Sequence, residues 1–371
     1  MNYLARSSLL MLLLGAPAFA ALEGVNHAET CGRCHRDILE AWRQSSHARA
    51  MENPIFQDAL ERAEQIRGRD ARQICLGCHA PTVQHSGDGS MKMKVSWEGV
   101  TCDFCHSLKS VEVQQHSATM NVRFDGTKTG PLRDASSIAH GTAYSAIHTT
   151  SLVCAGCHEY RNAQGFGVLT TYSEWEQSSY GSGGTNCQNC HMAETSANVV
   201  DPKIKRLSRS TVNLHAMPGS RSLDMLNKAV RLRLRTRREG NELVAEVDLE
   251  NRGAGHSIPT GSPLRRIELE VEMAARGQPL RQRRVYERQV VDANGKQIFR
   301  EELIFLSAVR ELRDTRLRPG EKRQEVFRFP LAASESARLY ARLWYNYSPQ
   351  ERSAAAQRVK FLVLPQYEAA R

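Results

Sequence analysis

The distribution of hydrophobic and polar residues changes sharply along this 371-residue chain. After about residue 220, apolar and polar positions alternate with a period of two, as in "VRLRLRTRREGNELVAEVDLEN" and "RRIELEVEM". Such alternation is typical of β-strands with one buried face. Similar segments follow ("RPGEKRQEVFRFPL" and "ARLYARLWYNY"), and Asn294–Gly295 favours a hairpin turn. The pattern predicts roughly seven short strands and an all-β, sandwich-like domain over residues 221–371.

The first 220 residues show only short periodic segments. Short helices are expected at residues 37–50, 53–66, 136–148 and 172–179, with turns and loops between them. Near the start, Arg6 is followed by the apolar run Leu9–Leu14 and by small residues around Ala20. This order is typical of a secretory signal peptide, and the run is too short to span a bilayer. We expect residues 1–20 to be a signal peptide and the mature protein to be periplasmic or extracellular, without a transmembrane anchor.

All ten cysteines fall into five Cys-x-x-Cys-His motifs. This spacing is typical of covalent haem attachment, in which two thioethers hold the porphyrin and the adjacent imidazole is the proximal iron ligand. Zinc ribbons do not require the histidine, and a redox disulfide site needs a single pair. The sequence therefore predicts five c-type haems, bound by Cys31, Cys34, Cys75, Cys78, Cys102, Cys105, Cys154, Cys157, Cys187 and Cys190, with His35, His79, His106, His158 and His191 as proximal ligands.

Eight further histidines are available as second axial ligands, so every haem could be bis-histidine. The candidates are His47, His140, His148, His215 and His256, whereas His27, His85 and His116 are less suitable. A helix through His140 and His148 would place them on roughly one face, where they could serve two different haems. His256 lies in a Gly/Pro-rich loop, "NRGAGHSIPTG", that suits close approach to a flat ligand. Nearby methionines rank below the histidines.

The motifs all lie within residues 31–191, so the porphyrins are expected to form much of the core of a haem domain over residues 21–220. Little regular secondary structure is expected there. Residues 21–200 contain 15 Lys/Arg and 19 Asp/Glu, a net charge of −4, and residues 201–371 contain 34 and 21, a net charge of +13. Haem propionates add further negative charge to the first half. This difference in charge favours docking of the two halves on each other or attraction of an acidic partner. Alternatively, the positive charge of the second half belongs to solvated, Arg-rich strand faces.

Several segments resemble multihaem c-type cytochromes of the broad group around hydroxylamine oxidoreductase and its tetrahaem electron acceptor. The resemblance rests on "CGRCHRDILEAWRQSSHARAM", "EGVTCDFCH", "CAGCHEY…TTYSEWEQSSY…CQNCHM" and "GAGHSIPTG…DTRLRPGE". It implies electron transfer outside the cytoplasm, usually in respiration, with His47, His140 or His148, and His256 as distal ligands. The chain lacks the Cys-x-x-Cys-Lys motif of multihaem nitrite reductases and has fewer motifs than octahaem hydroxylamine oxidoreductases.

The function predicted from the sequence is an exported electron-transfer relay in a respiratory or redox chain, working between two redox proteins. An exported haem protein is not expected to bind nucleic acid. The alternative is an oxidoreductase in which one open haem acts on a small nitrogen or sulfur compound. The haem on His79 is the candidate because the nearest spare histidine, His85, is a poor ligand. A lower alternative is a cytochrome filament, for which an unassigned histidine such as His27 would be the sign.

Overall fold

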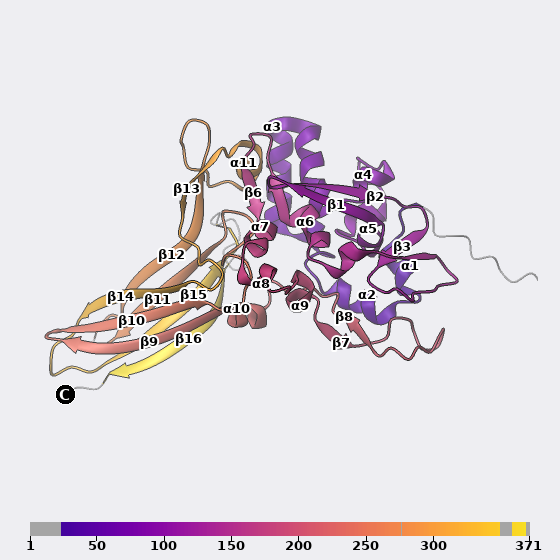
Figure 1. Cartoon of the computed structure of the whole chain (residues 1–371). Helices are drawn as coiled ribbons and strands as arrows, with labels where there is room; N and C mark the ends of the chain where they lie inside the picture. Colours follow the sequence, from indigo (N-terminus) through magenta and orange to yellow (C-terminus); the bar gives the residue numbers. More distant parts are fainter. Residues whose placement is uncertain (1–23, 276, 349–357, 369–371) are drawn as a thin grey trace, which may run out of the picture.

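The computed structural model describes residues 24–275, 277–348 and 358–368, in which a helical region is followed by a β-rich region (Figure 1). The expected signal peptide, residues 1–20, lies outside the described residues. In the described part of the chain, no helix has both the length and the apolar character needed to cross a membrane.

The first region contains mostly short helices, connected by turns, loops and small strands. They are α1 (Ala28–Gly32), α2 (Arg36–Arg43), α3 (Pro54–His79), α4 (Val83–Ser86), α5 (Cys102–His106), α6 (Leu152–His158), α7 (Thr171–Glu176), α8 (Ser179–Ser182) and α9 (Cys187–His191), with 3-10 turns η1 (Ala50–Glu52), η2 (Lys94–Trp97) and η3 (Ala146–Thr149). Helix α3 starts at a proline, and the Asn53 side chain caps it by accepting from Ile55 N at 3.0 Å. Gly68, with φ of 59°, breaks α3 into two arms.

The helices expected at residues 53–66 and 172–179 correspond to the first arm of α3 and to α7. The helix expected at residues 37–50 is shorter, because α2 ends at Arg43. The helix expected at residues 136–148 is wrong. Strand β4 (Gly141–Tyr144) lies there and pairs in parallel with β3 (Thr127–Gly130), since Thr142 and Tyr144 favour extended backbone. His140 and His148 therefore do not share a helix face.

Among the described residues, the first region also contains small two-stranded sheets, so it has more regular structure than expected. Besides β3–β4, these are β1 (Leu108–Gln114) with β2 (Ser117–Val122), β5 (Glu159–Arg161) with β6 (Gly167–Thr170), and β7 (Glu194–Ser196) with β8 (Thr211–Asn213). Each of these three pairs is antiparallel.

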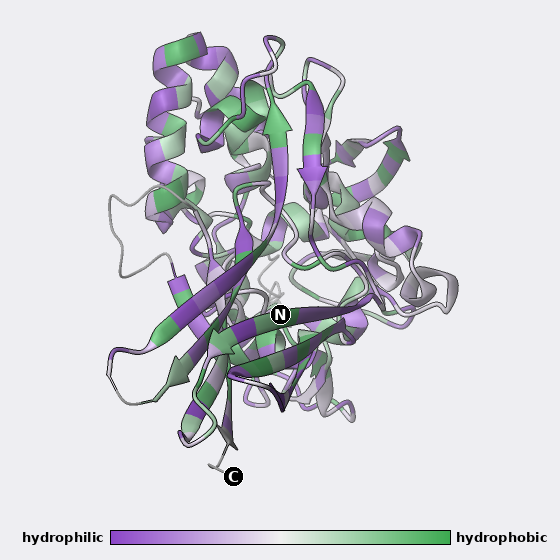
Figure 2. Cartoon of the chain, turned by 90° about the vertical axis from the view of Figure 1, so that its left-hand side faces the viewer, coloured by the Kyte–Doolittle hydropathy of each residue, from purple (hydrophilic) through white to green (hydrophobic). Residues whose placement is uncertain are grey.

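The second region is built from two antiparallel sheets. Its strands are β9 (Val230–Glu239), β10 (Glu242–Asn251), β11 (Arg266–Ala274), β12 (Leu280–Val291), β13 (Arg310–Asp314), β14 (Lys322–Pro330), β15 (Ala337–Asn346) and β16 (Arg358–Glu368). One sheet has the order β14-β10-β9 and the other β13-β12-β11-β15-β16. A single hydrophobic cluster joins both sheets, with Leu249 and Phe327 from the first and Leu269 and Leu343 from the second. Figure 2 shows the alternation of hydrophilic and hydrophobic residues along these strands.

The β-rich character of this region is confirmed, whereas an all-β fold is not. Two short helices, α10 (Leu223–Ala229) and α11 (Glu301–Ser307), lie among the strands. The expected hairpin at Asn294–Gly295 forms only a turn, closed by a bridge between Val291 and Gln297. The chain then enters α11 instead of a second strand.

The two regions are in direct contact. Helix α11 of the β-rich region packs on α3, where Leu306 joins a cluster with Ala63 and Ala71 (Figure 1). The Arg288 guanidinium on β12 donates to the carbonyl oxygens of Gly167 and Val168 at 3.0 Å each. Because these are buried contacts between distant parts of the chain, the sheets form one body with the helical region.

Candidate haem centres

The five cysteine motifs adopt closely related local structures. Helices α5 and α9 each span a whole motif, and α3 and α6 each end at the motif histidine. The first motif begins in the last turn of α1 and ends at His35, directly before α2. In a helical turn, residues three apart lie on the same side, so both cysteine sulfurs can reach one edge of a porphyrin. All ten thiols are free. The motif segments therefore have the local geometry that covalent haem attachment requires.

Three motif histidines each face a second imidazole at nearly the same separation. The ring centroids are 6.3 Å apart for His35 and His140, 6.2 Å for His158 and His47, and 6.4 Å for His191 and His256. Two imidazoles on opposite sides of one metal ion would have centroids about 6 Å apart, given metal–nitrogen bonds of about 2 Å. The spacing of these pairs therefore fits an iron ion between them.

His106 has two imidazole neighbours. The His215 ring lies 6.4 Å away and the His148 ring 5.7 Å away, both nearly parallel to it. The two candidates differ in orientation. His215 bonds through Nδ1 to the carbonyl oxygen of Asn213 at 2.7 Å, which leaves Nε2 for a metal. His148 instead uses Nε2, bonded to the carbonyl oxygen of Cys105 at 3.0 Å, and no partner of its buried Nδ1 is found within the described part of the chain.

The use of Nδ1 for a backbone carbonyl recurs throughout the site. Metal-bound histidines usually donate the second ring N–H in this way, which fixes the ring orientation. Besides His215, the contacts are His35 with Val199 O at 2.5 Å, His106 with Thr129 O at 2.7 Å, His191 with Pro218 O at 2.7 Å, His140 with Gly141 O at 2.9 Å, and His256 with Ser257 O at 3.0 Å. The chemistry and orientation of these histidines therefore fit the role of axial ligands to haem iron.

Burial keeps most of these imidazoles neutral, which is the form that binds metal. It lowers the pKa of His158 to about 3 and the pKa values of His79, His148 and His215 to about 4. Burial also lowers the pKa values of His47, His106 and His256.

His79, in the second motif, has a different neighbour. Its ring stacks on Phe56 with centroids 3.7 Å apart and an interplanar angle of 6°. Phe56 belongs to an apolar cluster that also contains Met51 and Leu76. No imidazole ring contact with His79 is found in the described part of the chain.

The loop that carries His256 is held by a buried ion pair between the two regions. Glu174 on α7 pairs with Arg316 at 2.8 Å, and the two side chains are 13% and 8% exposed. The same carboxylate accepts from Ser257 N and Thr260 Oγ1, both at 3.1 Å. A Cβ at Gly255 would lie 3.0 Å from Tyr180 and 3.1 Å from Trp175, so the absence of a side chain there permits the close approach. Sequence reasoning missed Glu174 and Arg316.

Contacts between cysteines indicate which motifs are neighbours. The Cys31 side chain lies close to Cys102, that of Cys78 close to Cys157, and that of Cys154 close to Cys187. Cys105 also lies within electrostatic range of Cys154 and Cys157. The first motif therefore adjoins the third, the third adjoins the fourth, and the fourth adjoins both the second and the fifth.

The three histidines judged less suitable lie away from the ring pairs. His27 bonds to Glu98 at 3.1 Å, His116 pairs with Glu159 at 2.5 Å, and His85 is exposed.

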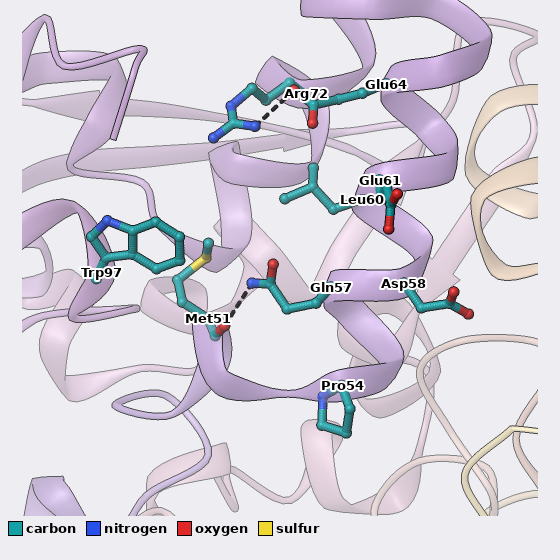
Figure 3. Close-up of a pocket in the computed structure, with 9 residues that line it drawn as sticks. All are labelled: Met51, Pro54, Gln57, Asp58, Leu60, Glu61, Glu64, Arg72 and Trp97. Carbon is teal, nitrogen blue, oxygen red and sulfur yellow. Dashed lines mark hydrogen bonds and ion pairs between the residues drawn. The ribbon is translucent and has the colours of Figure 1, made fainter. Parts of the chain in front are cut away.

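A pocket of about 410 Å³ lies along the first arm of α3, between Met51, Leu60, Arg72 and Trp97 (Figure 3). Its lining includes no motif residue, and Arg72 is paired there with Glu64 at 2.7 Å. It is therefore separate from the histidine pairs.

Comparisons with known proteins agree with the motifs. The family model described as "Cytochrome c554 and c-prime" matches residues 30–107. "Cytochrome c-554" of Nitrosomonas europaea (strain ATCC 19718 / CIP 103999 / KCTC 2705 / NBRC 14298) is 27% identical over 103 residues. That match spans 26% of this chain and 44% of the relative, less than half of its length.

A solved structure resembles nearly the whole chain. The penta-heme cytochrome c552 from Thermochromatium tepidum matches with a TM-score of 0.70 and 21% identity, covering 92% of this chain and 99% of the other. At this identity the match shows a shared fold. Together the comparisons support a multihaem c-type cytochrome with covalently bound haem.

Proposed function

We propose that this chain is an exported pentahaem cytochrome that relays electrons between two redox proteins in a respiratory or other redox chain. The observation that carries the proposal is that four motif histidines each face a second imidazole, with ring centroids 6.2–6.4 Å apart. Two strong axial ligands leave no position for a substrate, so such haems exchange electrons without binding one. Bound haem supplies the reversible one-electron change, and the chain supplies spacing, ligands and burial.

We assign four bis-histidine pairs: His35 with His140, His106 with His215, His158 with His47, and His191 with His256. The motif contacts favour a branched order in which the first haem is at one end, followed by the third and the fourth. The second and fifth haems both adjoin the fourth. The Gly255 approach and the Glu174–Arg316 pair support His256 as a ligand across the boundary between the regions. We also propose that the chain belongs to the group around hydroxylamine oxidoreductase. We propose further that residues 1–20 direct its export.

A second candidate function follows from His79. The Phe56 ring stacks on the His79 ring with centroids 3.7 Å apart, and no imidazole ring contact with His79 is found among the described residues. A haem there with an open sixth position would bind a small nitrogen or sulfur compound, making the protein an oxidoreductase. Cyanide binding to one haem in five, together with turnover of hydroxylamine or nitrite, would favour this candidate over a pure relay.

The relay is tested by combining intact mass spectrometry with an anaerobic dithionite titration. We expect five covalent haems, no disulfide and uptake of five electrons per chain. A smaller haem count, or a disulfide among the motif cysteines, would overturn the proposal.

A further inference from the structure

One loop of the helical region combines exposed positive charge with exposed apolar side chains. Residues 202–209 read "PKIKRLSR" and contain four basic residues and no acidic one. Lys203, Lys205, Arg206 and Arg209 are all exposed, and no ion pair of theirs is found among the described residues. This basic loop stands out because residues 21–200 carry a net charge of −4 from 15 basic and 19 acidic residues.

The segment leading into the basic loop is fastened to the first cysteine motif. Asp201 N donates to the carbonyl oxygen of Cys34 at 2.7 Å, and Val199 O bonds to His35 Nδ1 at 2.5 Å. Asn198 donates twice to Asp37 on α2, at 2.8 and 2.9 Å. Strands β7 and β8 close the base of the loop beside α2, at the end of the molecule remote from the two sheets (Figure 1). The loop therefore holds a fixed place beside the proximal ligand of the first haem.

The loop also presents apolar surface. Ile204 is 55% exposed and Leu207 is 38% exposed. Ile138, which is 84% exposed, lies two residues before His140, whose ring faces His35. An apolar centre with surrounding charge is the usual composition of a protein docking surface.

We propose that the basic loop, residues 202–209, is the docking surface for an acidic redox protein that exchanges electrons with the first haem. This inference rests on the proposed relay function, and it names the terminal haem and the charge of its partner. Complementary charge raises the rate of encounter by about 10-fold to 1,000-fold at low salt. Interfaces of electron-transfer partners are small, below about 1,200 Å², so a short loop is sufficient.

An anionic membrane surface would also attract four cations. The loop contains no Trp, Tyr or Phe, the residues that favour the membrane interface. Its position beside a haem ligand would serve no purpose in membrane attachment. A protein partner therefore accounts for both the charge and the place of the loop.

The test uses the haem-loaded full chain and a reduced, acidic plant-type ferredoxin as the electron donor. Each ferredoxin gives up one electron, which reduces one ferric haem of this chain. The loop variant combines K203E, K205E, R206E and R209E. The control variant combines R233E, K296E, R318E and R338E and makes the same change in net charge. These four residues of the β-rich region are exposed, and no ion pair of theirs is found in the described ranges. Stopped-flow measurements compare the reduction rates at low and high ionic strength.

We expect the loop variant to be reduced about tenfold more slowly than the wild type at low salt, and the control variant within about twofold. The difference should disappear at high salt because screening removes steering. Equal slowing of both variants would overturn the proposal, since net charge alone would then be responsible. An unchanged rate with loss of binding to phosphatidylglycerol vesicles would point to a membrane surface instead. An unchanged rate with a shifted potential of one haem would mean that the loop pairs with this chain's own propionates.

The dithionite titration separates this inference from the relay function. If all variants take up five electrons but show equal ferredoxin rates, only the docking proposal fails. If the wild type does not take up five electrons, the relay function itself fails.

Discussion

Replacing Glu174 with Gln tests how the two regions are joined at a haem. The substitution keeps the size of the side chain but removes the charge that faces Arg316 at 2.8 Å. Breaking a buried ion pair from one side typically costs about 3–5 kcal/mol. Here Asp314 still contacts Arg316 at 2.8 Å, and the Gln oxygen can still accept from Ser257 N. We therefore expect a smaller cost, about 2 kcal/mol.

This cost should fall on the loop that holds His256, because Glu174 also accepts from Thr260 on the same loop. A weakened loop lets an added ligand replace His256 more easily. About 2 kcal/mol corresponds to roughly 30-fold tighter apparent cyanide binding at the haem on His191. The assay is an optical and EPR titration of the oxidised protein with cyanide.

The matched control is Glu176→Gln, which makes the same change two residues later on α7, at an exposed side chain. We expect this control to bind cyanide like the wild type. Equal cyanide affinity in the wild type, E174Q and E176Q would refute the positioning role of Glu174. Equal tightening in both variants would refute it as well, since the effect would then not be specific to the ion pair.

Two further predictions concern other ligand positions. His215→Ala should convert one haem from low spin to high spin in the EPR spectrum. His148→Ala should leave the haem spin states unchanged, because His148 Nε2 is already bonded to Cys105 O. The reverse result would make His148, and not His215, the second ligand of the haem on His106. Gly99→Ala should destabilise the protein in thermal unfolding followed at the Soret band, and it should perturb the haem between His47 and His158. The reason is that Gly99 has a φ of +68° and that an added Cβ would lie 2.2 Å from the His47 carbonyl oxygen. A stability equal to that of the wild type would show that the backbone there adjusts.

The sequence predicts those features that depend on neighbouring residues. The motif histidines, the period-two strands after residue 220 and the turn at Asn294–Gly295 all follow from local patterns. The helix expected at residues 136–148 does not form because β3, the preceding strand of the chain, pairs with residues 141–144. A partner strand overrides weak local preference.

The histidine partners could not be derived from the sequence for a similar reason. Their choice depends on contacts between distant segments, such as that of His35 with His140. The ion pair of Glu174 with Arg316 is likewise long-range, and Ser257, the loop residue held by Glu174, lies 83 positions along the chain from it. Spacing along the sequence contains no signal for such pairs. The loop "GAGHSIPTG" is expected to approach a flat ligand closely, and in the structure its Gly255 lies close to Tyr180 and Trp175.

The central claim is that four haems are held between paired imidazoles and that the haem on His79 is not. Low-temperature EPR of the oxidised wild-type protein, with integration of each signal against a haem count, measures this directly. The account predicts four low-spin haems and one high-spin haem. Five low-spin haems would contradict the assignment at His79, and two or more high-spin haems would contradict the histidine pairs.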